Sequence, residues 1–557
     1  MDFILALHSH LPWVLHHGRW PHGSDWLCEA ALDTYLPLLS ALQGLEMERV
    51  EAPVTLGVTP VLASQLAHRS FALEMEAFFR QRLEACDAAP ASLAKTHDEA
   101  LVPLAGFWRQ RFESLRGLFD SVDGDLVRAF RALEERGRIE IISSAATHGF
   151  LPLLGRDESI RLQLLTGRLT HQRLFGRPPT GCWLPECAFR PGGPWAPPGA
   201  APARLRRGTD EMLREAGYRY FFVDSHLAHA GTFLARYQEI TIGAERFDAE
   251  RHGSDSELVT GVERTPYRAY AMPAGPGEAL LAALVRDPKC SMQVWSRRQG
   301  YPGDQWYLEF HKIRWPGGLK LWRVTGADLD LGLKVQYEPA AARGRAREHA
   351  GHFASILHAT ARSERRGRVI VAPFDTELFG HWWFEGVDFI ADLFRALHGG
   401  QVHPVTTREH VAARPPRTTI RLAEGSWGAN GDFSMWMNDQ TAWTWRRMWP
   451  LEDAFWAVAR EALRGGERQR AVLAQAAREL LLAQASDWQF IISTGVAADY
   501  AERRFSLHCD DAEALISALA PGADATALEA AASRAAELGT RDDLFPDVLE
   551  AVAGALA

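Results

Sequence analysis

The sequence predicts a parallel α/β fold, better closed into a barrel than left as an open sheet, followed by a separate helical domain. Seven short, mostly apolar runs over about 400 residues suit strands buried on both faces. Helical stretches separate several of them, and such alternation is typical of a parallel sheet. After about residue 420 the alternation stops, and residues 451–485 and the Ala-rich 523–557 have helical spacing.

The elements are expected in the following order. The strands are Phe3–His8, Val54–Thr59, Ile139–Ser144, Gly181–Leu184, Tyr218–Asp224, Leu319–Thr325 and Val369–Phe374. Helices are expected at Asp125–Arg136, Asp157–Arg173 and Asp210–Ala216. Residues 190–208 are rich in Pro and Gly and predict an ordered loop or small excursion. Residues 227–266 form a long polar connection, a length that is usually functional or disordered.

Composition excludes several classes of protein. The 61 Lys and Arg against 70 Asp and Glu give a net charge of −9, which disfavours nucleic acid and anionic membranes as partners. The N-terminus MDFILALHSH lacks the basic region of a signal peptide, and no apolar run is long enough to span a bilayer. The six cysteines are scattered and never spaced CxxC, so no disulfide framework is expected. We expect a soluble cytoplasmic protein, a monomer or weak oligomer.

Tryptophan is unusually frequent, with 19 residues, and it is clustered. A single Trp is most simply a core residue, but clusters in Gly- and Asn-rich segments indicate surface loops. Flat aromatic faces in a cleft stack on the C–H faces of sugars. We therefore interpret the excess as a sign of carbohydrate binding. The clusters are Trp20 with Trp26, Trp295 to Trp322, Trp382–Trp383, and Trp427 to Trp449.

Titratable side chains follow five of the expected strands. In a parallel barrel the carboxyl ends of the strands share one face, and the chemistry lies there. Glu186 and Asp375 each come directly after a strand, in aromatic-rich turns. Glycoside cleavage needs two carboxyl groups flanking one bond. Alone, Glu186 could be a salt-bridged acid and Asp375 a helix cap, but together at strand ends they favour catalysis.

Other chemistries are weaker. His8, His10 and His226, with His148 and Asp224 nearby, could ligate zinc in a glycosidase or deacetylase, although His-x-His is a weak signal. A non-catalytic glucan-binding protein could keep the same aromatic cleft. The sequence contains no GxSxG, no GxxxxGK[ST] and no well-placed GxGxxG, which argues against esterases, NTPases and dehydrogenases.

Several motifs also resemble a known family. HSHLPW at 8–13, THGFLPLL at 147–154, GCWLPECAFRPG at 181–192 and FDTELFGHWWFEG at 374–386 are similar to signature regions of glycoside hydrolase family 57. Three further segments resemble that family's 1,4-α-glucan branching enzymes. These are QVWSRRQGYPGD at 293–304, SWGANGDFSMWMN at 426–438 and SDWQFIISTGVAADYAERR at 486–504.

The resemblance implies a (β/α)7 barrel with a small inserted helical subdomain, within residues 1–420, and a helical domain at 421–557 that contributes Trp residues to the cleft. It implies a retaining mechanism without metal or cofactor, with Glu186 as nucleophile and Asp375 as general acid/base. The expected reaction cuts an α-1,4-glucan and transfers the chain to a 6-OH of another glucan, forming an α-1,6 branch. A 4-α-glucanotransferase or α-amylase of the same family is the nearest alternative.

Further residues are expected to bind the glucan. They are His8, His10, Trp26, His148, His226, Tyr267, Trp295, Asp304, His381, Trp427, Trp436 and Asp487. Relatives carry a Tyr on a flexible loop over the cleft, and the corresponding stretch looks enlarged in this sequence. Aligning RTPYRAYAM at 264–272 selects Tyr267 as that lid residue, with Tyr237 as the alternative. A core Tyr that opens a strand at Tyr267–Met272 is the competing interpretation.

Overall fold

The computed structural model describes residues 1–197, 202–230, 264–295, 300–326, 328–364 and 368–557. Seven parallel strands form its centre, and nearly every residue in them is buried. Apolar side chains on both faces, as in β1 (FILAL), suit this position between surrounding helices. In spatial order the strands are β10 (Val369–Asp375), β1 (Asp2–Ser9), β2 (Val54–Val58), β3 (Ile139–Ser144), β4 (Gly181–Trp183), β7 (Tyr220–Val223) and β9 (Ala282–Val285).

The sheet curves into a barrel whose first and last strands meet. Asp287 N, just after β9, donates to Val371 O of β10 at 2.8 Å, across the seam between those strands. Two short strands extend the sheet: β8 (Tyr270–Ala271) runs antiparallel to β9, and β11 (His403–Pro404) pairs with the start of β1. The predicted (β/α)7 barrel is confirmed.

One predicted strand is wrong. Leu319–Thr325 forms only isolated bridges, such as Leu319 with Arg314 and Arg323 with Leu308. The seventh barrel strand is instead β9, whose sequence AALV looks helical because Ala is the best helix former. Tertiary packing against β7 overrides that preference.

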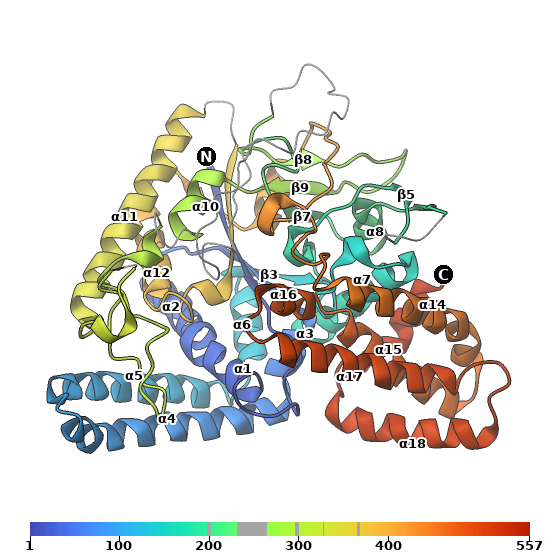
Figure 1. Ribbon diagram of the computed structural model, residues 1–557. Helices are drawn as coiled ribbons and strands as arrows, with labels where there is room; N and C mark the ends of the chain where they lie inside the picture. Colours follow the sequence, from blue (N-terminus) through green and yellow to red (C-terminus); the bar gives the residue numbers. More distant parts are fainter. Residues whose placement is uncertain (198–201, 231–263, 296–299, 327, 365–367) are drawn as a thin grey trace.

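Helices surround the barrel. They are α1 (Ser24–Ala30), α2 (Leu36–Met47), α3 (Pro60–Leu66), α6 (Leu126–Glu135), α7 (Asp157–Phe175), α8 (Thr209–Glu215), α10 (Pro288–Trp295), α11 (Pro339–Ser363), α12 (Gly386–Leu397) and α13 (Thr407–Ala413). The three predicted helices correspond to α6, α7 and α8. A long helical hairpin, α4 (Arg69–Lys95) and α5 (Val102–Ser121), is inserted between β2 and β3 and lies at the lower left of Figure 1. Within the predicted loop 190–208, β5 (Gly193–Trp195) and β6 (Arg204–Arg206) pair as a small hairpin.

A second group of helices lies at the lower right of Figure 1. It comprises α14 (Ala442–Arg464), α15 (Glu467–Ala483), α16 (Asp487–Thr494), α17 (Ala498–Ser517), α18 (Ala525–Arg541) and α19 (Val548–Ala555). The central α15 packs against α14, α17, α18 and α19, and α19 packs in turn on the barrel helix α7. Among the described residues, no helix combines the length and the apolar character needed to cross a membrane.

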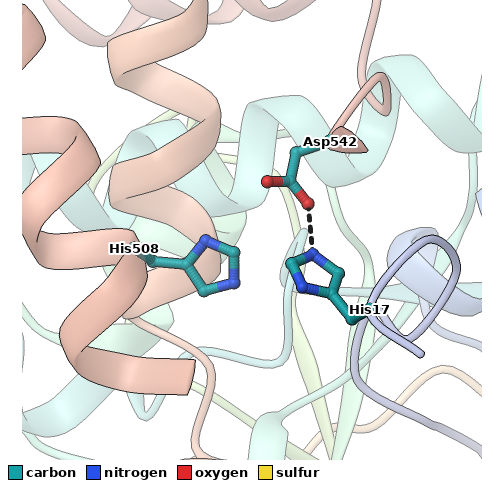
Figure 2. Close-up of side chains that lie close together, drawn as sticks. All are labelled: His17, His508 and Asp542. Atoms are coloured by element: carbon teal, nitrogen blue, oxygen red, sulfur yellow. Dashed lines mark hydrogen bonds and ion pairs between the residues drawn. The ribbon is translucent and has the colours of Figure 1, made fainter. Parts of the chain in front are cut away.

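A buried polar cluster joins the helical domain to the loop after β1 (Figure 2). His17 Nε2 donates to Asp542 Oδ1 at 2.7 Å, and His508 of α17 lies beside this pair. Arg541 Nε donates to the other Asp542 oxygen at 2.7 Å, and His508 Nδ1 bonds Glu479 of α15 at 2.7 Å. The cluster therefore links the barrel to three segments of the helical domain.

Candidate active site

Glu186 lies in a strained turn at the end of β4. The turn Pro185–Cys187 follows the strand directly, and Glu186 has φ 59° and ψ 22°, in the left-handed region that disfavours side chains. Two hydrogen bonds from Trp427 hold it there. The indole Nε1 donates to Glu186 Oε2 at 2.9 Å, and the Trp427 backbone N donates to the Glu186 carbonyl at 3.0 Å. The segment before α14 thus fixes the orientation of this carboxylate.

Asp375 is the last residue of β10, and the strand register places it opposite His8 of β1. Its backbone is relaxed, with φ −68° and ψ 135°. The next two residues are anchored within the barrel: Ser9 Oγ donates to Thr376 Oγ1 at 2.8 Å, and Glu377 Oε1 accepts from Tyr35 OH at 2.5 Å and from His10 N at 3.2 Å. Glu377 is a third acid beside the predicted pair.

The three acids share one electrostatic environment. Burial raises the pKa of Glu186 to about 8; the negative charges of Asp375 and Asp487 add to this, while the Trp427 hydrogen bond opposes it. Burial likewise raises the pKa of Glu377 to about 8, with the charge of Asp375 adding to it and the Tyr35 hydrogen bond opposing it. The site consequently holds protons near neutral pH.

Three histidine rings stack beside Glu186. His10 and His148 lie with ring centroids 4.0 Å apart, and His8 Nε2 bonds His148 Nε2 at 2.9 Å. His8 also stacks on Trp183, with the ring centroids 4.6 Å apart and the ring planes nearly parallel. His148 Nδ1 is 3.8 Å from Glu186 Oε1. Burial, with neighbouring His charges, lowers the pKa of both His8 and His148 well below the usual range, so both rings are neutral at pH 7.

The start of α16 completes this cluster. Asp487 accepts from His10 Nε2 at 3.0 and 3.1 Å to its two oxygens, and Ser486 Oγ lies 2.9 Å from His148 Nδ1. Asp487 therefore lies at the contact between barrel and helical domain, where the sequence motif predicted it.

Arg286 and Trp295 pack against Trp427, the residue that bonds Glu186. The Arg286 guanidinium lies 4.9 Å from the Trp427 ring centre and 5.9 Å from that of Trp295, and it pairs with Asp224 at 2.9 Å. His226 Nε2 bonds the Gly431 carbonyl at 3.0 Å. His8, His10, His148, His226, Trp295, Trp427 and Asp487 thus belong to one contiguous network around Glu186.

This arrangement agrees with comparisons to known proteins. The sequence model of glycosyl hydrolase family 57 matches residues 4–423, which include both strand-end acids. The chain belongs to glycosyl hydrolase family 57. The model of the 1,4-alpha-glucan branching enzyme C-terminal region matches residues 448–552 of the same chain.

Three similar proteins show how far the likeness extends. The 1,4-alpha-glucan branching enzyme TK1436 of Thermococcus kodakarensis is 39% identical over 511 residues, 91% of this chain and 72% of that protein. Its crystal structure covers 98% of this chain and 95% of its own, with a TM-score of 0.87 and 38% identity. The branching enzyme of Pyrococcus horikoshii gives a TM-score of 0.86, with 36% identity over 99% of this chain and 96% of that one. The α-amylase AmyC of Thermotoga maritima gives 0.77, with 29% identity and 99% of each chain covered.

The structure places two predicted glucan-binding residues of this family 57 chain in the core, away from the position predicted for them. Tyr267 is 5% exposed, and its carbonyl accepts from Arg368 N and Val369 N at the amino end of β10, the opposite end from Asp375. It is the core Tyr of the competing interpretation. Trp436 is fully buried and stacked on Phe150 at 4.4 Å, so its ring offers no face to a sugar. Tyr237, the alternative lid residue, and most of the 227–266 connection lie outside the described residues.

Three other predicted residues make their contacts elsewhere. Asp304 bonds Arg345 of α11 at 2.7 Å, and His381 Nδ1 lies 3.7 Å from Asp33. Trp26 is half-buried on α1, and its ring forms a T-shaped contact with the ring of His22, with the ring centroids 6.0 Å apart. Their roles toward a glucan stay predictions.

Sequence reasoning missed several residues of the network. Glu377 stands two residues after Asp375 in the same motif, and sequence reasoning did not single it out. Ser486 precedes Asp487, and Arg286 follows the unrecognised strand β9, so its burial could not be anticipated. Tyr35 lies in an ordinary helical stretch, where nothing in the sequence marks it.

His8, His10 and His148 of the alternative zinc site stack on one another, but among the described residues their ligand atoms do not gather as a group of three. Among the described residues, three or more possible ligands gather only at His17, His508 and Asp542 and at Glu29, Asp33 and His381. In the first group Arg541 pairs with Asp542, and in the second Lys320 bonds Asp33 at 2.9 Å. In each group a basic side chain already pairs with a carboxylate. Neither group contains His8, His10 or His226.

Proposed function

We propose that this chain is a 1,4-α-glucan branching enzyme that uses Glu186 as nucleophile and Asp375 as general acid/base. The observation that carries the proposal is the contact of Trp427 with Glu186. A segment resembling branching enzymes, outside the barrel, supplies the hydrogen bond that orients the acid at the end of β4. The likeness to TK1436 and to the Pyrococcus horikoshii enzyme along nearly the whole chain supports the same function.

The first step is formation of a glycosyl-enzyme. The ionised Glu186 carboxylate attacks the anomeric carbon of an α-1,4-glucan while the bond to the departing glycosidic oxygen breaks. Asp375 gives its proton to that oxygen, so a free chain end leaves and Asp375 becomes a carboxylate. A site that retains protons near neutral pH suits this step, because one acid must be ionised while its neighbour is protonated.

The second step decides between branching and hydrolysis. Asp375 takes the proton from the 6-OH of an acceptor glucan, whose oxygen attacks the anomeric carbon and releases Glu186. The product is an α-1,6 branch; water in place of the 6-OH gives hydrolysis. Neutral His8 and His148 each combine a donor with an acceptor nitrogen, which suits recognition of sugar hydroxyls without adding charge.

The proposal also includes the substrates, the domain division and the oligomeric state. Donor and acceptor are both α-1,4-glucans, the division lies at 1–420 and 421–557, and the chain acts as a monomer or weak oligomer. A cytoplasmic location is supported by six buried cysteines, all of them free.

The decisive experiment incubates purified protein with amylose and then with a debranching enzyme. Branching predicts new α-1,6 points in excess of new reducing ends, and Glu186→Gln should produce neither. The likeness to the Thermotoga maritima α-amylase makes hydrolysis the second candidate. Reducing ends without branch points would establish that candidate and reject branching.

A further inference from the structure

A cleft among the described residues lies away from the strand ends. It has a volume of about 730 Å³ and lies between α2, α5, α11 and α12. In Figure 1 these helices are on the opposite side of the barrel from the helical domain that contacts Glu186. The volume falls within the range of small-molecule sites. Neither the predicted acids nor the histidine stack lines this cleft.

Arg111 of α5 is the unusual residue of this cleft. Its guanidinium stacks on the ring of Phe384 at 4.5 Å, and among the described residues it has no hydrogen bond and no ion pair. Burial lowers its pKa, a sign that the charge is held away from water. Most other arginines of the chain pair with an acid or a carbonyl. A guanidinium fixed by stacking, with its donors free, is prepared to bind a planar or tetrahedral oxyanion.

Two further arginines line the same cleft from α11. Arg343 and Arg347 are four residues apart, so they project from one face of the helix. Their ion pairs are long, 3.7 Å to Asp388 and 3.6 Å to Asp392, and their side chains are 65% and 72% exposed. Such pairs contribute little, so both guanidinium groups can turn toward a ligand at small cost.

The acids of the cleft do not cancel this charge. Glu385 is 1% exposed, and burial raises its pKa to about 7. Its Oε1 accepts from Tyr337 OH at 2.6 Å and Leu308 N at 3.1 Å, while its buried Oε2 has no hydrogen-bond partner among the described residues. In its protonated form Glu385 is a neutral donor, and Asp388 is the other acid that lines the cleft with the three arginines.

We propose that this cleft binds a small phosphorylated ligand of sugar-phosphate size, with Arg111 as the central anchor and Arg343 and Arg347 at the rim. A phosphate monoester is close to a dianion at pH 7, and several guanidinium groups match its charge and geometry better than they match a single carboxylate. Ser40, Gln110 and Ser114 also line the cleft and offer hydrogen bonds to sugar hydroxyls. The inference is independent of the proposed glucan chemistry.

Isothermal titration calorimetry on the full chain tests this site. The titrants are inorganic phosphate, glucose 6-phosphate, gluconate as a matched carboxylate, and glucose. We expect saturable binding of glucose 6-phosphate and weaker binding of phosphate, with gluconate and glucose at least tenfold weaker still. Arg111→Gln should raise the Kd for glucose 6-phosphate by about tenfold or more, since it removes charge-assisted hydrogen bonds.

Two other variants keep the test decisive. Arg347→Gln alters an exposed side chain, cannot disturb the core, and should raise the Kd about threefold. Arg116→Gln is the matched control, since Arg116 is on the same helix but pairs with Glu76 of α4 at 3.0 Å; it should leave the Kd unchanged. No saturation by glucose 6-phosphate up to about 10 mM would overturn the proposal. Equal binding of gluconate, or an unchanged Kd in both Arg111→Gln and Arg347→Gln, would overturn it as well.

Discussion

Glu186 and Asp375 both lie at the ends of barrel strands, but they are held in different ways. Glu186 has a left-handed backbone and depends on hydrogen bonds from Trp427, which lies beyond the barrel strands. Asp375 has relaxed extended backbone, and the turn that follows it is bonded to Ser9, Tyr35 and His10 of the barrel itself. The orientation of Glu186 therefore depends on the C-terminal part of the chain, whereas the turn that follows Asp375 is held by the barrel.

This difference suggests that the barrel and the C-terminal part of the chain each position one of the two acids. The barrel alone can position an acid that gives and takes protons, because strand register places Asp375 opposite His8. Directing a carboxylate at an anomeric carbon needs a strained turn, and a strained turn persists only where its surroundings fix it. Trp427, Asp487 and Ser486 supply those surroundings. Substitutions on the two sides should thus differ in kind as well as in size.

The largest effect is expected from Glu186→Gln. Loss of the nucleophile should lower kcat on amylose by about 10⁴-fold or more.

Replacing Glu186 by Gln should also stabilise the fold. The pKa of Glu186 is raised to about 8 by burial, so the folded state resists its ionisation, and stability falls as pH rises from the unfolded value toward 8. Thermal melts at pH 5 and pH 8 should show a gain for the variant that grows with pH.

Glu140→Gln is the matched control for this experiment. Glu140 is another fully buried acid with a pKa raised by burial, to about 7, but it bonds Tyr220 in β7 and the backbone of α13. It should keep its branching activity. Near-normal turnover of Glu186→Gln would reject the assignment of the nucleophile.

A smaller loss is expected from Asp375→Asn, because the group supplies a proton rather than a covalent bond. We expect kcat/KM on amylose to fall about 10³-fold. With an activated glycosyl fluoride, whose leaving group needs no proton, the loss in the first step should be far smaller. Equal losses on both substrates would contradict a general-acid role.

Trp427 and Trp436 give the sharpest test of the comparison, because sequence reasoning treated them alike. Trp427→Phe removes the Nε1–H donor to Glu186 and should lower kcat about 10- to 100-fold. Since that hydrogen bond lowers the pKa of Glu186, the acid limb of the pH profile should move to higher pH. Trp436→Phe removes an Nε1 that has no partner, and it should leave the pH profile in place. A shift in the second variant, or none in the first, would break the proposed link.

Glu377→Gln should change activity least among the acids. The amide oxygen can still accept from Tyr35 and His10, so kcat at pH 7 should fall less than about fivefold. The pKa of Glu377 is about 8, and its ionisation places a negative charge beside Asp375 just as Asp375 must become negative. The ratio of the kcat of the variant to that of the parent should therefore increase as pH rises through about 8. Superimposable pH profiles would show that Glu377 is only structural.

Sequence patterns revealed those parts of the site that local chemistry marks. Strand ends and family motifs were sufficient for the barrel, for the placement of Glu186 and Asp375 at strand ends, and for the contact of Asp487 with the barrel. They failed where packing decides. Trp436 and Trp427 occur in one Gly-rich segment, yet only the fold directs one ring onto Phe150 and the other toward Glu186. Strand β9 was hidden because its Ala residues favour a helix, and Arg286 was missed with it.

The last prediction concerns the attachment of the helical domain rather than the chemistry. Burial alone would raise the pKa of Asp542, but the hydrogen bond from His17 and the charge of Arg541 lower it below its usual range. The stability that Asp542 contributes is therefore present at neutral pH and disappears as pH falls below about 4.

Asp542→Asn should lower the free energy of unfolding by about 2–3 kcal/mol in urea at pH 7. The loss is limited to this size because Arg541 keeps its second partner, Asp511. Asp543→Asn is the matched control: its carboxylate also bonds a histidine, His68 at 3.0 Å, but is 38% exposed, so its effect should stay below about 1 kcal/mol. Equal effects in the two variants, or a difference between parent and Asp542→Asn that persists at pH 3, would show that the buried cluster does not fasten the helical domain.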